Sequence, residues 1–310
     1  MTSAVASPDL PPLPAFIARQ LPFERRVLTL RSGVDAGRRI HLLDHGDPAA
    51  TAVLMVHGNP TWSFLWRGVI ARLEGFRCVA PDLLGLGLSD RLPKISDHSV
   101  ARHCDAVHEV VELLGLERPI LVGQDWGGPI AMGVGARLGE RIRGVVLGNT
   151  SVLAPKRPRG TAFHRFSRMP LVSDFAFRVL GLPQRILHRI QGDPASIRGD
   201  VARAYRWPLK GWKNTVSPLA LARMVPGSAD HPSMPELRRG EDWLRGFPGP
   251  VALVWGRRDP ILGRALKRHR EALPAATVTE TDAGHFLQEE VPEELAAAVR
   301  RVASLSGTSS

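Results

Sequence analysis

The sequence predicts an α/β fold in which helices cover both faces of a mostly parallel sheet and a helical segment is inserted late in the chain. Between about residues 26 and 149, short apolar runs typical of buried strands alternate with helix-like segments. From about residue 150 the strand-like runs stop, and short amphipathic pieces alternate with proline and glycine breaks until an apolar run resumes at Val251. We therefore expect three parts: a discontinuous core over 23–149 and 240–305, a helical cap over 150–239, and an N-terminal arm over 1–22.

Six runs are expected to form strands, because each is short, apolar and bounded by turn residues. They cover residues 52–56, 77–80, 119–122, 144–148, 251–256 and 277–281. The segment from Asp97 to Gly115 has the pattern of a helix, with Asp97 placed to cap its start and Gly115 placed to end it. Its apolar face is predicted to hold Val100, Cys104, Val107, Val111 and Leu114.

The turn after the run 119–122 is the most informative stretch of the chain. Gly123 and Gly127 flank Asp125, and a helix-like segment rich in small residues follows. A strand, a tight turn with small neighbours and a helix form the setting of a nucleophile elbow, whose strained apex usually holds a serine. An aspartate is already ionised, so it can attack a saturated carbon directly and form an ester with the enzyme. The alternative for the pentapeptide alone is a tight turn with a solvated aspartate.

Two further residues complete a triad in the expected chain order of nucleophile, acid and histidine. Asp259 lies in the loop after the run 251–256, and His285 lies in the turn after the run 277–281. With Asp125, each is at the carboxyl end of a strand, where open α/β sheets place their sites. The chain has 11 histidines, and His98, His103 and His108 are set aside because they share one polar, helix-like segment. A helix cap near Leu262 is the alternative role for Asp259.

The turn that follows the strand 52–56 is expected to supply an oxyanion hole. In elbow hydrolases one backbone N–H comes from this turn and the other from the residue after the nucleophile, here Asn59 and Trp126. Both side chains also carry N–H donors, which suit a leaving group that becomes an anion and has no proton of its own, such as a halide. The alternatives are an ordinary turn residue for Asn59 and a packed core aromatic for Trp126.

At these residues the chain resembles the haloalkane dehalogenases of the α/β-hydrolase fold, from about Phe23 to Val302. The resemblance implies an eight-stranded, mostly parallel sheet with a helical cap, and a hydrolytic reaction through an aspartyl ester. It implies Asp125 as nucleophile, His285 as base, and Asn59 with Trp126 as halide-binding donors. The motifs that carry it are His57-Gly58-Asn59-Pro60-Thr61-Trp62 with Trp66-Arg67, the run from Pro81 to Asp90, the elbow Gln124-Asp125-Trp126-Gly127-Gly128, and Gly284-His285-Phe286.

The position of the acid selects a branch within that family. One branch places a glutamate after the sixth strand, where this chain has Asn149 and Thr150, so the acid falls to Asp259. A triad of Asp125, His285 and Asp259 with Asn59 and Trp126 looks like the third dehalogenase subfamily. That subfamily is also close to the β-lactone decarboxylases of bacterial olefin biosynthesis, which share the nucleophile and the histidine. Decarboxylation of a β-lactone is therefore an open alternative.

Two related activities are disfavoured by what the sequence lacks. Epoxide hydrolases of this fold protonate the opening epoxide with a pair of cap tyrosines, whereas this chain has one tyrosine, Tyr205. Fluoroacetate dehalogenases hold a carboxylate substrate with arginines just after the nucleophile, whereas residues 126–129 contain none. An anionic substrate is not expected.

Length and composition limit the remaining classes. A chain of 310 residues with 44% hydrophobic content can bury a full core. No apolar run approaches the about 18 residues of a membrane-spanning helix, and the segment 1–22 lacks the pattern of a signal peptide. Two cysteines, Cys78 and Cys104, do not make a disulfide framework. We expect a cytoplasmic protein with no membrane partner.

The net charge of +11 raises the question of nucleic-acid binding. Arginine supplies 36 of the 41 basic residues, and no helix-turn-helix, zinc-finger or RNA-binding signature accompanies them, so no specific nucleic-acid partner is expected. A non-enzymatic, arginine-rich binding protein on a hydrolase scaffold is the alternative to an enzyme. No metal-ligand spacing is present, and we expect neither a metal nor an organic cofactor. The expected partners are a small apolar halogenated substrate, water and halide, and a homo-oligomer is left open.

Overall fold

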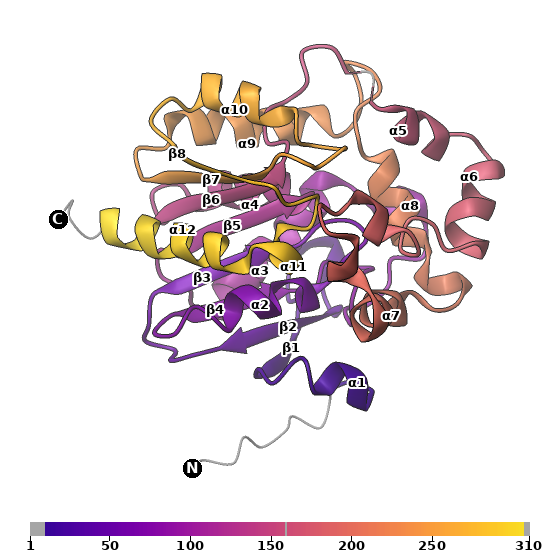
Figure 1. Ribbon diagram of the computed structural model, residues 1–310, viewed down its shortest axis with the longest axis horizontal. Coiled ribbons are helices and arrows are strands. Elements are labelled where there is room, and N and C mark those ends of the chain that lie inside the picture. The colour runs from indigo at the N-terminus through magenta and orange to yellow at the C-terminus, as the bar shows by residue number, and fades with distance from the viewer. Residues whose placement is uncertain (1–9, 159, 307–310) are drawn as a thin grey trace.

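The computed structural model describes residues 10–158 and 160–306 and has an eight-stranded sheet at its centre (Figure 1). The predicted N-terminal arm is described from residue 10 onward, where it contains the short helix α1 (Ala15–Ala18), and residues 1–9 lie outside the described part. None of the helices in the described ranges has the length and apolar character needed to cross a bilayer.

The sheet has the order β1-β2-β4-β3-β5-β6-β7-β8. β1 pairs with β2 and β2 with β4 in antiparallel fashion, and the pairs from β4 onward are parallel. The α/β class and the six predicted strands are confirmed, with the two strands that lead to the site running two to three residues longer than expected. The strands are β1 (Arg25–Thr29), β2 (Arg39–His45), β3 (Ala52–Val56), β4 (Arg77–Pro81), β5 (Ile120–Asp125), β6 (Gly144–Thr150), β7 (Val251–Gly256) and β8 (Thr277–Thr281).

Two separate cores hold the helices on the two faces of the sheet. Side chains alternate along a strand, so Leu54 and Val56 of β3 enter one core while Val53 and Met55 enter the other. The first core packs α3 (Val100–Leu113), α4 (Gly127–Leu138), α9 (Met234–Gly246) and α10 (Ala265–Ala272) on the sheet. The second packs α2 (Arg67–Ile70), α11 (Leu287–Glu290) and α12 (Pro292–Leu305) on the opposite face.

The predicted helix from Asp97 to Gly115 is present, but its start and its histidines differ from expectation. α3 is capped by Ser99, whose Oγ accepts a hydrogen bond from the Arg102 N–H at 3.1 Å. Asp97 instead accepts a bond from the Lys94 N–H and closes a short 3-10 turn. Gly115 ends the helix with a φ of +58°.

His98 and His103, which were set aside because they share one polar, helix-like segment, do not lie at the surface. Both side chains are buried, and His98 Nδ1 lies 3.2 Å from His103 Nε2. The polar atoms of the two rings partly satisfy each other, which permits burial of residue types that a sequence pattern assigns to the surface.

After β6 ends at Thr150, the regular structure in the described part of the predicted cap segment consists of helices and helical turns. It contains α5 (Ala162–Ser167), α6 (Val172–Asp174), a π-helical turn (Phe175–Val179), α7 (Gly199–Arg206) and α8 (Val216–Arg223), joined by short 3-10 turns. These elements gather at one end of the sheet (Figure 1). A small core of its own, centred on Phe177 and Leu219, holds the cap together. The division into core and cap at residues 150 and 239 remains our proposal.

Candidate active site

The nucleophile elbow is a tight turn between β5 and α4, with Asp125 at its apex. Asp125 has a φ of +51°, a conformation that few side chains adopt without support from the surrounding structure. The flanking glycines are required by close approach, because a Cβ on Gly127 would lie 1.9 Å from the Val56 carbonyl oxygen. A Cβ on Gly123 would lie 2.6 Å from the Gly127 carbonyl oxygen. The turn therefore holds the Asp125 side chain, 17% exposed, at the end of the sheet.

The two oxygens of the Asp125 carboxylate have different surroundings. Oδ1 accepts a hydrogen bond of 2.7 Å from the backbone N–H of Asn59. This approach needs a glycine at position 58, because a Cβ there would lie 2.3 Å from Oδ1. Oδ2 lies 3.6 Å from His285 Nε2 and accepts no backbone hydrogen bond within the described residues. Oδ1 is thus fixed, and Oδ2 is the oxygen free to react.

His285 is held by Asp259 through a bond of 2.9 Å between Nδ1 and Oδ2. Since an ionised carboxylate only accepts, Nδ1 carries a proton and Nε2 is the nitrogen turned toward Asp125. Burial alone would lower the pKa of His285, but the charges of Asp259 and Asp125 raise it to about 10. Burial acts to raise the pKa of Asp259, and the charge of His285 outweighs this and lowers it. In the free protein the pair is therefore an ion pair.

Asn149, at the end of β6, is a site residue that sequence reasoning did not assign. It is buried, has a φ of +31°, and its Nδ2 donates at 2.9 Å to Asp259 Oδ2 and at 2.9 Å to the Gly284 carbonyl. Its Oδ1 accepts from the Gly256 N–H at 2.8 Å, so its partners fix the orientation of the amide. Asn149 joins the loop that bears the acid to the loop that bears the histidine. Its place at the end of a central strand was the only signal for this role.

Both predicted halide donors adjoin the nucleophile, Asn59 through its backbone N–H and Trp126 as the next residue in the chain. Asn59 Nδ2 donates to the Pro218 carbonyl of α8 at 2.9 Å, which leaves the second amide hydrogen without a partner in the described residues. The Asn59 Oδ1 atom is buried and has no described partner. Trp126 is 8% exposed, and neither its indole N–H nor its backbone N–H bonds the Asp125 carboxylate in the described part of the chain. Of the two expected oxyanion donors, Asn59 alone donates a hydrogen bond to the Asp125 carboxylate in the described part of the chain.

Two more side chains near the triad were also not predicted. Gln124 Nε2 donates to the His285 carbonyl at 3.0 Å and lies 3.4 Å from His285 Nε2. His164 of α5 lies within electrostatic range of Asp125, although its burial dominates and lowers its pKa to about 4.

Tyr205, the only tyrosine in the sequence, does not bond a triad residue. Its hydroxyl donates to Glu289, and its ring is buried in the second core.

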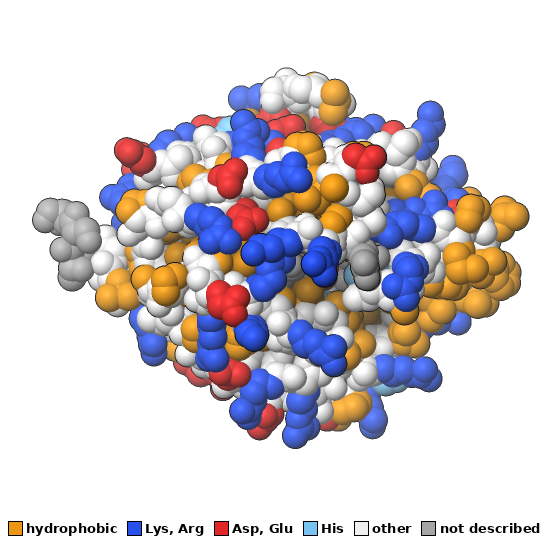
Figure 2. All heavy atoms as spheres, turned by 90° about the horizontal axis from the view of Figure 1, so that it is seen from above, with side chains coloured by type: hydrophobic (Ala, Val, Ile, Leu, Met, Phe, Trp, Pro, Cys, Tyr) orange, Lys and Arg blue, Asp and Glu red, His pale blue; other side chains and the backbone are white. Residues whose placement is uncertain are grey.

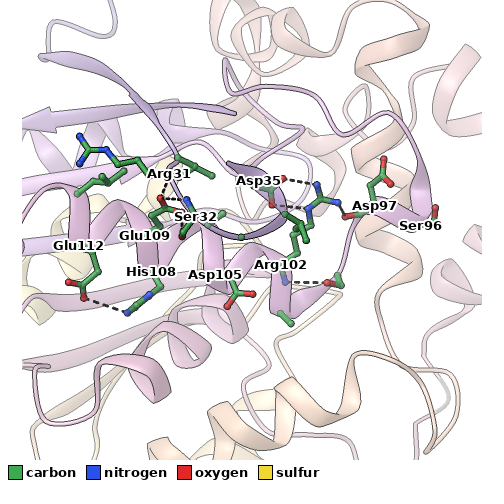
Figure 3. A pocket seen from close by; sticks show the side chains of 17 residues that line it. Arg31, Ser32, Asp35, Ser96, Asp97, Arg102, Asp105, His108, Glu109 and Glu112 are labelled. Atoms are coloured by element: carbon green, nitrogen blue, oxygen red, sulfur yellow. Dashed lines mark hydrogen bonds and ion pairs between the residues drawn. The ribbon is translucent and has the colours of Figure 1, made fainter. Parts of the chain in front are cut away.

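A hollow of about 890 Å³ lies along α3 and does not include the triad (Figure 3). Several of its charged side chains are bonded within it: Arg102 makes bonds of 2.8 and 2.6 Å to Asp35, and Glu109 accepts from the Ser32 hydroxyl at 2.9 Å. No group of three or more histidine, cysteine or acidic side chains suited to a metal occurs among residues 10–158 and 160–306. The cluster around Asp125 remains the candidate active site.

Comparisons with known proteins identify the family and the fold of this chain. The family described as alpha/beta hydrolase fold matches residues 51–292. Haloalkane dehalogenase 2 of Mycobacterium tuberculosis (strain H37Rv) is 36% identical over 299 residues, covering 90% of this chain and 94% of the relative. The haloalkane dehalogenase of Mycobacterium marinum is 32% identical over 267 residues, covering 83% and 86%. The tetrameric haloalkane dehalogenase of Paraglaciecola agarilytica has a TM-score of 0.80 at 25% identity, with 91% and 93% covered.

Proposed function

The chain belongs to the haloalkane dehalogenases of the α/β-hydrolase fold, and we propose that Asp125, His285 and Asp259 carry out its reaction. This membership confirms the resemblance inferred from the motifs, and the enzyme hydrolyses carbon–halogen bonds of haloalkanes to an alcohol and a halide. The observation that supports the residue assignment best is the carboxylate at the strained apex of the elbow, 3.6 Å from the imidazole of His285.

In the first step Asp125 Oδ2 attacks the carbon that bears the halogen. A carbon–oxygen bond forms, the carbon–halogen bond breaks, and the halide leaves with the bonding electron pair. The Asn59 N–H holds Oδ1 and so orients the carboxylate for in-line displacement. No base is needed, because the nucleophile is already ionised.

In the second step His285 activates a water molecule that hydrolyses the ester. Alkylation neutralises Asp125 and removes one of the two charges that raise the pKa of His285, so the imidazole becomes a base when a base is needed. Once Asp125 is esterified, the imidazolium gives its Nε2 proton to solvent, and the neutral Nε2 can then take a proton from water as the hydroxide attacks Cγ of Asp125. The tetrahedral intermediate expels the alkoxide, which takes up one proton and leaves as the alcohol, and the Asp125 carboxylate and the His285 imidazolium are restored. Asp259 stabilises the imidazolium, and the Asn59 N–H holds the developing oxyanion.

The free amide hydrogen of Asn59 and the indole N–H of Trp126 bind the departing halide in this proposal. Each is a donor with no described partner, on a residue that either bonds Asp125 through its backbone or follows Asp125 in the chain. By analogy with oxyanion donors, removal of one would slow turnover by roughly 100- to 1000-fold.

A trapping experiment tests the assignment. His285→Gln should release one equivalent of halide from a short bromoalkane and then stop, because the displacement needs no base and the hydrolysis does. Intact mass should rise by one alkyl group less a proton, on the peptide that contains Asp125. Halide release with no mass change would remove His285 as the base, and a label on another peptide would remove Asp125 as the nucleophile.

Decarboxylation of a β-lactone is the alternative activity. None of the relatives above is named for it. Assaying the wild-type protein for halide from a bromoalkane, and for alkene and carbon dioxide from a disubstituted β-lactone, separates the two activities. Inactivity on both with tight polyanion binding would favour a non-enzymatic role. A cytoplasmic location and a homo-oligomer, the latter suggested by the tetrameric relative, stay proposals.

A further inference from the structure

The positive charge of this chain is concentrated in the cap. Residues 150–239 contain 16 lysines and arginines against five aspartates and glutamates, whereas the rest of the chain contains 25 of each. The net charge of +11 therefore belongs entirely to this segment. Arg165, Arg185 and Lys213 are exposed, and none of them forms an ion pair with a described residue. Such a one-sided charge distribution is typical of proteins that bind a polyanionic partner.

The same segment exposes large apolar side chains. Six of them lie on α6, the π-helical turn and their flanks, and we call this set the apolar ridge: Met169, Leu171, Val172, Phe175, Val179 and Leu180. Leu171 is 84% exposed. Hydrophobic side chains gather at the edge of the molecule in Figure 2 where α6 lies in Figure 1, with Lys and Arg side chains beside them. An exposed patch of this kind marks an interaction surface.

Trp212 adds a third feature to this surface. It is 52% exposed, and the guanidinium of Arg178 lies 3.5 Å from the centre of its ring. Tryptophan and arginine are the side chains that favour the boundary between lipid headgroups and acyl chains, since each combines an apolar body with a polar group.

We propose that the apolar ridge and the surrounding cations dock this protein on an anionic lipid surface. The aliphatic side chains of the ridge would enter the boundary below the headgroups, while Arg165, Arg185 and Lys213 bind the lipid phosphates. We expected no membrane partner because the sequence has no run long enough to span a membrane. Peripheral docking needs no spanning helix, so that expectation does not apply to it. The proposal is independent of the proposed function.

Two other occupants fit this surface less well. A second copy docked cap to cap would bring together two segments with a charge of +11 each, which repel. A nucleic acid would use the cations but gain nothing from Leu171 and Val179, because aliphatic side chains neither stack on bases nor bind phosphate. A lipid surface of negative charge uses both features.

Vesicle sedimentation of the full chain tests the proposal. We expect strong binding to vesicles of equal parts phosphatidylglycerol and phosphatidylcholine, weaker binding to phosphatidylcholine alone, and partial release by salt. Leu171→Ser with Val179→Ser should weaken binding by about tenfold or more, because two exposed apolar contacts are lost. Arg165→Gln with Arg185→Gln should weaken it by about fivefold for each charge.

Matched controls lie on the core. Val34 is 82% exposed, so Val34→Ser removes an equally exposed apolar side chain outside the cap. Arg264→Gln with Arg301→Gln removes two exposed charges outside the cap. Both controls should bind vesicles as the wild type does. All variants should keep the wild-type melting temperature and halide release, and Leu171→Ser alone serves if the double variant does not fold.

Three results would overturn the proposal. The first is equal binding to both vesicle types, or none. The second is vesicle binding that is reduced by the arginine variants but not by the ridge variants, together with an equal affinity of the protein for duplex DNA. That result would identify a general polyanion site. The third is a ridge variant that changes the particle mass in light scattering and leaves vesicle binding unchanged, which would identify the ridge as a contact between copies.

Discussion

Around the sheet, acidic and basic residues occur in equal numbers, 25 of each, whereas the cap has 16 basic residues against five acidic ones. The acid and the histidine of the site are held by partners within the molecule: Asp259 bonds both His285 and Asn149. The cap has the reverse arrangement, with apolar side chains such as Leu171 in solvent and exposed cations, among them Arg165 and Arg185, that form no ion pair with a described residue. Catalysis needs fixed geometry, so the groups that orient the triad are bonded within the molecule, while exposed groups of the cap are left for a partner outside it.

The largest contrast between the two regions is expected at Asp125. Asp125→Asn keeps the shape of the side chain but removes its charge, and turnover should fall by about ten-thousandfold or more. The cap variant Leu171→Ser should leave halide release unchanged. Both rates are measured on a short bromoalkane, with melting temperatures as the folding control. Substantial activity in Asp125→Asn protein whose mass excludes deamidation would contradict the assignment.

The next effect concerns the acid. Asp259 Oδ2 bonds His285, and Oδ1 accepts from the Ile261 N–H at 2.7 Å, so this carboxylate both orients the imidazole and caps the following turn. Asp259→Asn should slow ester hydrolysis by about a thousandfold or more and leave halide release fast, which gives a burst of halide followed by a slow steady state. A variant with a lower melting temperature, no burst and near-normal turnover would leave only the capping role.

A smaller effect is expected at Asn149, which touches Asp259 but no reacting atom. Asn149→Ala removes one donor from an ionised carboxylate, and ester hydrolysis should slow by roughly 10- to 100-fold. Single-turnover kinetics separate the two steps, and halide release should stay at the wild-type rate. A positioning role also requires the pH profile of ester hydrolysis to shift, whereas a change in melting temperature alone would show a purely structural residue.

Much of the fold and the location of the site could be predicted because the informative residues lie at the ends of strands. Asp125, Asp259 and His285 each follow an apolar run, and their order along the chain was sufficient to predict that they lie close together. Their geometry matches that expectation, and their roles remain to be tested. Asn149 could be excluded as an acid from its residue type, but its function depends on contacts with Gly256 and Gly284, more than 100 residues away.

The cap was harder to predict, and for a physical reason. Periodicity identifies an apolar face but does not show whether anything covers it, so the exposure of Leu171 and Val179 could not be anticipated. His98 and His103 were set aside as part of one polar, helix-like segment, whereas in the structure the two rings contact each other and are buried. Contacts between segments distant in sequence decide such cases.

The last prediction concerns the contact between core and cap at His98. His98 Nε2 lies 3.3 Å from the hydroxyl of Ser217 in α8, and His98 Nδ1 contacts His103 of α3. Burial, reinforced by Arg102 and opposed by Asp97 and Asp35, lowers the pKa of His98 to about 4. Burial also lowers the pKa of His103, with His98, His57 and Arg102 acting in the same direction.

Since the unfolded histidine titrates near its ordinary pKa of about 6.5, the unfolded chain binds more protons than the folded one between about pH 6.5 and pH 4. The contribution of His98 to stability is therefore complete above that window and decreases as the pH falls through it. Between about pH 7.5 and pH 5 the wild type should lose about 2 kcal/mol more of its free energy of unfolding than His98→Gln, measured in urea. Equal losses of unfolding free energy in the two proteins would show that His98, at this contact between core and cap, does not titrate with the lowered pKa that its burial implies.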